Sequence, residues 1–199
     1  MAAFNAGIER IFREGEGYRL ECGDGYSFWS RWVVNAAGHG AAALSRGLGI
    51  PTPEVYPARG CYFSYAGRSP VRRLIYPVPP ARGRGLGIHA TLDLGGRLRF
   101  GPDLEYVDRV DDFRVSAGLR PKFAAAVARY LPKLDPARLA PEMAGIRPRL
   151  QGPGDDFRDF LIREESGAGF PGFINLLGIE SPGLTASPAI AEEVAGLLL

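Results

Sequence analysis

The chain has 199 residues, of which 46% are hydrophobic and 23% are charged, with a formal net charge of +2. This composition is that of a globular chain with one or two small domains, and it excludes a largely disordered protein. The 24 basic and 22 acidic residues are interspersed, which argues against a nucleic-acid binder with a concentrated basic face.

No apolar run is long enough to span a membrane, and the first residues do not resemble a signal peptide. A cytoplasmic protein is therefore the default expectation, and a homo-oligomer is compatible with it. The two cysteines, Cys22 and Cys61, form neither a disulfide framework nor a metal-binding spacing, so we expect reduced, partly buried thiols and no metal site.

Residues 1–57 are predicted to contain short strands followed by a helix. Three strands are expected, with Gly23-Asp24-Gly25 as the turn between the last two: Phe4 to Phe12, Tyr18 to Cys22 and Tyr26 to Trp29. Arg31 to Ala37 predicts a buried strand. A helix is expected from about His39 to Arg46, ended by Gly47 and Gly49.

The turn between that strand and helix fits a dinucleotide-binding fingerprint, because Gly38 to Ala43 has the pattern G-x-G-x-x-A. A primary fingerprint would be followed by a second strand that ends in an acidic residue. Instead, three prolines crowd the next segment, with Glu54 among them: Pro51, Pro53 and Pro57. The sequence therefore disfavours a first βα turn here. The small residues also suit a tightly packed strand-to-helix turn.

Residues 58–165 are predicted to form an α+β domain, with an antiparallel sheet and helices on one side. Six short strands are expected, with a Gly95-Gly96 hairpin between the third and fourth: Arg59 to Tyr65, Leu74 to Val78, Leu86 to Thr91, Arg97 to Gly101, Met143 to Leu150 and Phe160 to Arg163. A helix is expected from Pro121 to Leu131, with Phe123, Val127, Tyr130 and Leu131 on one face.

The chain has two histidines, His39 and His89. His39 is expected to be a surface or packing residue in a turn. His89 lies between Ile88 and Ala90 on a predicted strand, where a lone histidine is usually structural but can also act as a base. Two basic pairs are expected to be solvated turn charges: Arg72-Arg73 and Arg82/Arg84. Gly83 to Gly87 mimics a phosphate loop but lacks the helix to complete it.

Residues 166–199 are predicted to contain a buried strand, a tight loop and a helix. Phe173 to Leu177 is apolar and bounded by glycines, and a loop from Gly178 to Pro188 follows. The helix is expected over Ala189 to Leu199, with Thr185 or Ser187 as its N-cap. Main-chain N–H groups of such a loop, together with the helix N-terminus, can bind an anion or an electron-rich carbonyl.

The loop from Gly178 to Pro188 resembles the C-terminal flavin motif of the D-amino-acid-oxidase-like family, in the branch similar to L-2-hydroxyglutarate dehydrogenases. Val33 to Gly38 resembles the Ala-Gly motif that closes the FAD-binding domain in that family. Four further segments resemble motifs of the substrate domain of this branch: Ile75 to Pro79, Gly87 to Thr91, Gly101-Pro102 and Gly145 to Pro148. The resemblance covers nearly the whole chain.

The resemblance implies an α+β (α/β) fold that combines part of a glutathione-reductase-like FAD-binding domain with an antiparallel-sheet substrate domain. Residues 1–57 and 166–199 would belong to the first and residues 58–165 to the second. The N-terminal βαβ unit that holds the ADP half of FAD is expected to be missing, so this chain alone is expected to hold FAD weakly. The residues expected to contact the flavin are Ala36, Ala37, Gly38, Gly145, Gly178, Ser181, Pro182, Gly183, Leu184 and Thr185.

The resemblance also implies a catalytic centre that oxidises a small 2-hydroxy acid, such as L-2-hydroxyglutarate, by hydride transfer to FAD. His89 becomes the first choice for the base, and Arg147, in the Gly-Ile-Arg-Pro motif, for the residue that binds the substrate carboxylate. Further candidates for substrate binding are Arg59, Tyr62 and Tyr76. Two alternatives stay open: an amino-acid or amine oxidase of the same fold, and a cofactor-free fragment that only packs against a partner.

Overall fold

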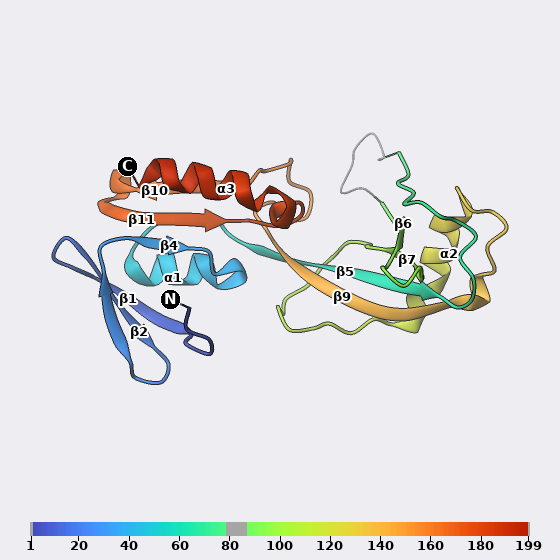
Figure 1. Ribbon diagram of the computed structural model, residues 1–199, viewed down its shortest axis with the longest axis horizontal. Helices are drawn as coiled ribbons and strands as arrows, with labels where there is room; N and C mark the ends of the chain where they lie inside the picture. The colour runs from blue at the N-terminus through green and yellow to red at the C-terminus, as the bar shows by residue number, and fades with distance from the viewer. Residues whose placement is uncertain (1, 79–86, 199) are drawn as a thin grey trace. The chain divides into compact units, whose positions relative to one another are not determined.

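The computed structural model describes residues 2–78 and 87–198, which divide into two compact units (Figure 1). Unit 1 contains the residues up to Tyr56 and those from Pro148 onward, and unit 2 is Pro57–Arg147. The chain thus leaves unit 1 once and returns to it. The sequence placed the return at residue 166, but residues 148–165 belong to unit 1 because strand β10 pairs with β11 there.

Unit 1 contains two three-stranded sheets and two α-helices. The antiparallel sheet has the order β1-β2-β3, and the mixed sheet has the order β10-β11-β4. The elements are β1 (Ile8–Glu14), β2 (Gly17–Cys22), β3 (Ser27–Ser30), β4 (Val33–Asn35), the 3₁₀ turn η1 (Gly38–Gly40), α1 (Ala41–Leu48), β10 (Leu161–Glu165), the 3₁₀ turn η4 (Ser166–Ala168), β11 (Phe170–Leu177) and α3 (Gly183–Leu197).

Strand β11 is the centre of unit 1, and its predicted burial is confirmed. It pairs in parallel with β4, with Asn175 opposite Asn35, and antiparallel with β10. Its side chains alternate between two cores. Phe173 packs with side chains of β1, β2 and α1, whereas Ile174 packs with α3, which lies along the strand in Figure 1. Coverage of both faces explains why the strand is a continuous apolar run rather than an alternating one.

A buried polar network crosses this sheet within its apolar surroundings. Asn35 Nδ2 donates to Asn175 Oδ1 (2.9 Å) and to Ser45 Oγ (3.0 Å), and Ser45 Oγ donates to Asn175 Oδ1 (2.6 Å). Asn175 Nδ2 donates to Glu165 Oε1 (2.7 Å), and Arg163 forms an ion pair with the same carboxylate (3.0 Å). The network therefore ties β4, α1, β11 and β10 together by side chains.

The helices of unit 1 differ from expectation at their ends. Helix α1 runs through Gly47 and ends before Gly49. Helix α3 begins at Gly183, six residues earlier than predicted, so neither Thr185 nor Ser187 is its N-cap. Pro188 lies inside the helix, where it cannot donate to the carbonyl of Leu184. Ser187 Oγ donates to that carbonyl instead (2.8 Å), which explains how the helix passes through the proline.

Unit 2 contains a five-stranded sheet in which β6, β7, β5 and β8 follow one another and β9 also pairs with β5. The paired registers in this sheet are antiparallel, and the expected hairpin at Gly95-Gly96 joins β6 to β7. The elements are β5 (Tyr56–Tyr65), β6 (His89–Leu92), β7 (Leu98–Gly101), β8 (Glu105–Tyr106), the 3₁₀ turn η2 (Ala117–Leu119), α2 (Arg120–Ala128), the 3₁₀ turn η3 (Pro136–Arg138) and β9 (Leu139–Arg149).

Helix α2 covers one face of this sheet, as the apolar pattern predicted. Phe123 and Val127 of α2 pack in one core with Phe63 and Phe100 of the sheet. The expected strand from Leu74 to Val78 is reduced to a bridge between Ile75 and Ala90. Pro77 has no N–H group to extend that pairing. Pro79, the Arg82/Arg84 pair, Gly83 to Leu86 and Leu199 lie outside the described residues.

The strand that follows α1 shows whether the Gly38–Ala43 pattern belongs to a βαβ unit. The next strand after α1 is β5, which belongs to the antiparallel sheet of unit 2 and not to the sheet of β4. In the described part of the chain, this turn therefore does not open a βαβ unit, as the prolines after it predicted.

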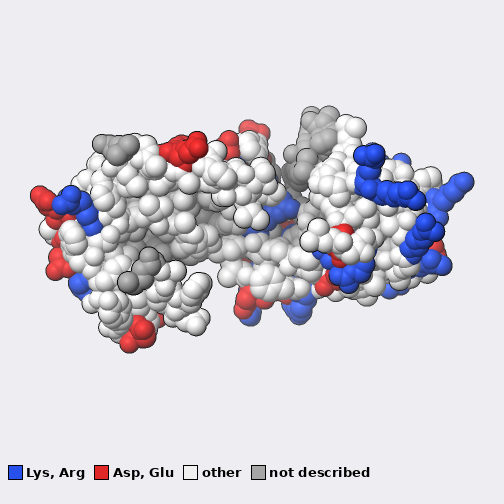
Figure 2. Space-filling view, in the orientation of Figure 1, with Lys and Arg blue, Asp and Glu red and all other residues white. Residues whose placement is uncertain are grey.

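Three further findings concern the sequence expectations. Cys22 and Cys61 are free thiols, and both are buried more fully than the sequence indicated. Within residues 2–78 and 87–198, no helix combines the length and apolarity needed to cross a bilayer. On the face shown in Figure 2, acidic and basic side chains adjoin at several places, basic side chains gather on unit 2, and a broad uncharged area covers the middle of unit 1.

Replacing Asn175 by alanine tests the buried network. Asn175 is fully buried and bonds with Asn35, Ser45 and Glu165, so its loss leaves several buried polar groups without that partner. We expect the free energy of unfolding to fall by about 3 kcal/mol. Val34→Ala in neighbouring β4, where the side chain is 42% exposed, should cost less than about 1 kcal/mol in the same urea titration. Equal losses would contradict a special role of the network.

Candidate functional site

Two predicted ligand-binding segments lie at one edge of the mixed sheet in unit 1. Residues 36–38 follow β4 and residues 178–185 follow β11. Because β4 and β11 are parallel neighbours, their carboxyl ends meet at the same edge of the sheet. Open sheets with parallel strands commonly bind ligands at this edge. The structure therefore brings together nine of the ten residues that were assigned to a cofactor.

The tenth, Gly145, lies on β9 in unit 2, two residues before Arg147, and is not part of this edge.

Both segments contain exposed residues: in the second, Ser181, Pro182, Leu184 and Thr185 are exposed, whereas Gly178 and Gly183 are buried. Ala36 and Ala37 are exposed, and a Cβ built on Gly38 would meet no other atom within 4 Å. Among the described side chains none caps the first turn of α3, so the N–H groups that follow Gly183 in that turn are suited to a ligand acceptor. The turn before the helix is closed by the main chain, since Gly183 N donates to Glu180 O (2.6 Å).

In unit 2, predicted site residues lie on the face of the sheet opposite helix α2. The register pairs Phe63 with Phe100 and Ala90 with Phe100, and all three side chains belong to the core under α2. Side chains of adjacent residues on a strand point to opposite faces. Tyr62 and His89 therefore share the other face, and the register places both beside Gly101.

Gly101 is the residue whose role the sequence did not reveal. A Cβ at this position would lie 2.6 Å from Cys61 O and 2.7 Å from Cδ1 of the Tyr62 ring. Glycine is thus required for the close approach of the Tyr62 ring to strand β7. The Gly-Pro pair was visible in the sequence as a motif, but its steric purpose depends on the strand pairing.

Tyr76 and Arg147 complete this group of four, which we call the His89 cluster: His89, Tyr62, Tyr76 and Arg147. The rings of Tyr76 and His89 stack with their centroids 4.5 Å apart and an interplanar angle of 22°. Arg147, on β9, is close enough for its charge to lower the pKa of both Tyr62 and His89. The cluster thus combines a histidine, two phenols and a guanidinium.

The protonation states in the cluster follow from burial. His89 is 8% exposed, and burial lowers the pKa of its imidazole, with a smaller contribution in the same direction from Arg147. Burial raises the pKa of Tyr62, and Arg147 opposes this only in part. The imidazole is therefore neutral and the Tyr62 phenol protonated near neutral pH. His89 Nδ1 lies 3.4 Å from Gly87 O, a contact that requires Nδ1–H and leaves the lone pair on Nε2.

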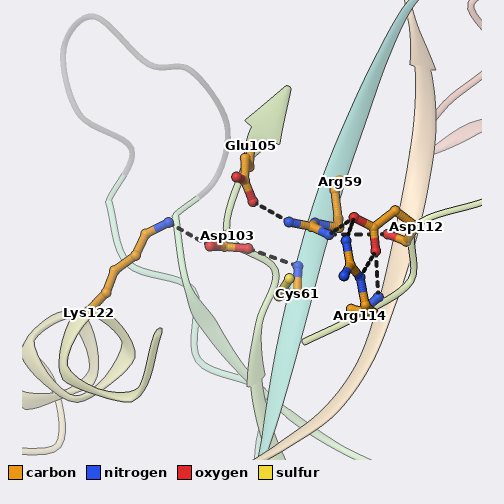
Figure 3. Close-up of polar contacts among 7 residues, drawn as sticks. All are labelled: Arg59, Cys61, Asp103, Glu105, Asp112, Arg114 and Lys122. Atoms are coloured by element: carbon orange, nitrogen blue, oxygen red, sulfur yellow. Dashed lines mark hydrogen bonds and ion pairs between the residues drawn. The ribbon is translucent and has the colours of Figure 1, made fainter. Parts of the chain in front are cut away.

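Arg59, the second candidate for binding a carboxylate, is occupied by carboxylates of the protein itself (Figure 3). Its Nη2 contacts Glu105 Oε2 (2.7 Å) and its Nη1 contacts Asp112 Oδ2 (3.0 Å). Arg114 binds the other side of Asp112 (2.7 Å) and holds the pKa of that carboxyl far below its usual range. This arrangement joins β5, β8 and the segment after β8, and it gives Arg59 a structural role.

A second polar group in Figure 3 fixes strand β5 from the other side. Asp103 is 7% exposed, accepts the main-chain N–H of Cys61 (2.8 Å) and pairs with Lys122 Nζ of α2 (2.5 Å). Burial, helped by the charge of Asp103, raises the pKa of the Cys61 thiol to about 11. Cys61 is therefore a protonated, unreactive thiol at neutral pH.

Comparisons with known proteins bear on the family and the fold of the chain. A family model described as "FAD dependent oxidoreductase" (DAO) matches residues 3–197. The chain is 43% identical over 182 residues to the mitochondrial L-2-hydroxyglutarate dehydrogenase of Arabidopsis thaliana. This match covers 84% of this chain and 37% of that protein. It is 34% identical over 193 residues to a glycerol 3-phosphate dehydrogenase of Caloramator mitchellensis, covering 94% and 38%.

Among solved structures, the chain is similar to L-alpha-glycerophosphate oxidase from Mycoplasma pneumoniae with FAD bound. The TM-score is 0.79 and the sequence identity 24%, and the match covers 98% of this chain and 50% of that one. This likeness shows the fold. The chain thus spans half or less of the length of each of these three proteins.

The lowered pKa of His89 predicts a pH dependence of stability. In the unfolded chain the imidazole returns to its ordinary pKa of 6.5, so below that pH the unfolded state binds a proton that the folded state excludes. The stabilisation is complete above pH 6.5 and is lost as the pH falls through the folded pKa. Urea titrations from pH 7.5 to 5 should show a shallower loss of stability for His89→Gln than for the wild type.

Tyr130→Phe is the control, because it removes a hydrogen bond to Ile88 O (3.1 Å) and burial raises the pKa of this phenol to about 12, so it should keep the wild-type dependence on pH between 7.5 and 5. Parallel stability curves for the wild type and His89→Gln would show that His89 is not buried in its neutral form.

Proposed function

Because this chain belongs to the family of FAD-dependent oxidoreductases, we propose that it is the substrate-binding and flavin-contacting part of an enzyme that oxidises a small 2-hydroxy acid. The family is the one that the sequence motifs indicated, and L-2-hydroxyglutarate is the first candidate substrate. The observation that carries the proposal is the His89 cluster, in which a buried neutral imidazole lies within the electrostatic reach of an arginine. The 43% identity to an L-2-hydroxyglutarate dehydrogenase supports the choice of substrate.

The residues at the edge of the mixed sheet fit the pyrimidine end of a flavin. That end carries carbonyl oxygens and a ring nitrogen, which call for main-chain donors and for the absence of bulky side chains. The uncapped first turn of α3 supplies donors, and the space beside Gly38 is open. We assign this contact to Ala36, Ala37, Gly38 and the segment from Gly178 to Thr185. A bound flavin would supply the acceptor for the hydride.

His89 is proposed to remove the hydroxyl proton of the substrate. Oxidation of a 2-hydroxy acid breaks an O–H and a C–H bond, and the O–H proton needs an acceptor as the hydride leaves. Nε2 of the neutral imidazole carries the lone pair for this transfer. Stacking on Tyr76 fixes the plane of the ring. After the transfer, the imidazolium would release its proton readily, because burial and Arg147 disfavour the charged form.

Arg147 is proposed to bind the substrate carboxylate. A planar guanidinium can form two parallel hydrogen bonds with a carboxylate, which fixes the orientation of the substrate as well as its affinity. The other candidate, Arg59, is paired with Glu105 and Asp112, so the proposal rests on Arg147, whose charge acts on both His89 and Tyr62. Tyr62, protonated near neutral pH, is suited to donate a hydrogen bond to the bound substrate.

Replacing Arg147 by lysine should weaken substrate binding, because a point charge takes the place of a two-pronged donor. A charge-assisted hydrogen bond contributes on the order of 2 kcal/mol, so KM for L-2-hydroxyglutarate should rise roughly thirtyfold in the FAD-loaded enzyme. Arg99→Lys is the matched control, since Arg99 lies on β7 and pairs with Glu142 (2.7 Å). Its KM should stay near the wild-type value, and an unchanged KM for Arg147→Lys would reject the assignment.

Replacing His89 by glutamine should lower the rate of flavin reduction by about 10² to 10⁴, because glutamine keeps a polar side chain but cannot take the proton. The measurement is single-turnover reduction of the FAD-loaded enzyme by L-2-hydroxyglutarate. Tyr130→Phe is the control, because its hydroxyl donates to Ile88 O (3.1 Å) and its loss loosens the same strand from the opposite face. That variant should melt earlier and react at a nearly normal rate.

The same assay separates the proposed reaction from the alternatives. An amine or amino-acid substrate arrives with its reacting nitrogen neutral, so His89→Gln would slow its oxidation little. Faster reduction of the wild type by glycerol 3-phosphate or by an amino acid than by L-2-hydroxyglutarate would change the assigned substrate. A normal rate of His89→Gln with every substrate would end the assignment of His89 as the base.

A further inference from the structure

The segment that precedes helix α3 is fastened to the end of strand β9 by an ion pair that the proposed chemistry does not use. Arg149 Nε contacts Glu180 Oε1 at 3.0 Å, and both residues belong to unit 1. Glu180 lies within the segment of residues 178–185, which we call the flavin loop because the proposed function assigns it to the flavin. One partner of the ion pair, Glu180, is therefore part of the segment that is proposed to contact the cofactor.

The pair is enclosed rather than exposed. Each side chain is 11% exposed, which is far below the exposure of the surface pair Arg46–Glu54 in the same unit, at 47% and 63%. Gln151, which is 4% exposed, lies beside this guanidinium; in the orientation of its amide that satisfies both ends, its oxygen accepts from Arg149 Nη2 and its nitrogen donates to Arg158 O (3.2 Å). A buried guanidinium held on two sides by a carboxylate and an amide has one defined position.

A second contact brings the start of the flavin loop to the same strand end. Gly178 has a φ of +71°, and a Cβ at this residue would lie 2.5 Å from Cγ of Leu150. The main chain thus packs directly on the side chain that follows Arg149. Two residues further along, Glu180 reaches Arg149 with its carboxylate and accepts Gly183 N–H with its carbonyl (2.6 Å). The side chain of Glu180 fixes the loop, and its main chain closes the turn into α3.

We propose that Arg149 and Glu180 are positioning residues that hold the flavin loop, and with it the uncapped first turn of α3, in the conformation that receives the flavin. This inference rests on the proposed function for the identity of the ligand, whereas the fastening of the loop is a property of the chain itself. Neither residue is assigned a contact with the flavin. They act through the main chain of residues 178–185.

Glu180→Gln tests the proposal without any ligand. The glutamine keeps the size of the side chain but leaves the Arg149 charge in an enclosed site without its counter-ion. Amide hydrogen exchange, measured peptide by peptide, should become about tenfold faster or more over residues 178–186. Exchange over the buried strand β11 should remain at the wild-type rate, because that strand is held by the sheet and not by this pair.

The second measurement is the affinity for FAD, followed by quenching of its fluorescence. If the flavin loop is in its binding conformation for only about a tenth of the time, the apparent Kd for FAD rises about tenfold. We therefore expect Glu180→Gln to have a Kd for FAD about ten times the wild-type value. Arg149→Lys keeps the charge but cannot reach Glu180 and Gln151 together, and should give an intermediate effect on both measurements.

Asp112→Asn is the matched control, because Asp112 also forms a 3.0 Å ion pair with an arginine and the two side chains are 18% and 13% exposed. It should change neither the exchange of residues 178–186 nor the Kd for FAD, even if the melting temperature falls.

If Glu180→Gln raises the amide exchange rate equally throughout unit 1, the ion pair only adds stability. If the exchange rate over residues 178–186 does not change, the ion pair does not fasten the loop. Either result overturns the proposal. Because the chain alone is expected to hold FAD weakly, only a wild-type chain that leaves FAD unquenched even at the highest attainable protein concentration would count against the cofactor site of the proposed function. The exchange pattern would still decide the role of Arg149 and Glu180.

Discussion

The parallel pairing of β4 with β11 is the constraint on which unit 1 depends. Asn35 and Asn175 are 140 residues apart in the chain, yet they lie opposite each other and share a hydrogen bond. All residues of unit 2 lie between these two strands in the sequence, so the pairing joins the segments before and after unit 2. It creates a sheet with a helix on each face, and it places two loops at one edge. The edge with two loops is the feature that a flavin can use.

The polar network at this pairing has a cost and a benefit. Transfer of amide, hydroxyl and carboxylate groups from water into the interior costs free energy. Hydrogen bonds with the correct geometry offset this cost. The hydrogen bonds of Asn175 to Asn35, Ser45 and Glu165 form in one register of β4 and β11. Asn35 Oδ1 is buried there without a hydrogen-bond partner among the described residues, and a shift of one residue would separate Asn35 from Asn175. The network selects the register, while the apolar side chains of β11 supply most of the favourable burial.

The two faces of the sheet in unit 2 carry different kinds of side chain. The face under α2 is apolar and contains Phe63, Phe100 and Phe123. The opposite face presents Tyr62 and His89, and the same strands supply both sets because neighbouring residues alternate. The arginines are divided in a similar way. Arg59 is neutralised by two carboxylates, whereas Arg147 lies close to a neutral imidazole and a phenol. The proposed role of Arg147 in binding an anionic substrate rests on its place in the His89 cluster.

The sequence by itself determined the elements whose signals are local, such as the hairpin at Gly95-Gly96, the apolar face of α2 and the buried strand from Phe173 to Leu177. It also indicated the family through short motifs that contain His89 and Arg147. It misplaced the start of α3, because the hydroxyl of Ser187 satisfies the carbonyl that Pro188 leaves without a donor.

Only the tertiary structure decided which residues meet. That Gly101 must lack a side chain, that Arg59 is occupied and that Arg149 holds Glu180 are consequences of contacts between segments far apart in the chain. The return to unit 1 at residue 148 depends on the pairing of β10 with β11. Residue patterns report the conformation of a few neighbouring residues, whereas strand partners and ion pairs are chosen by the free energy of the whole packed unit.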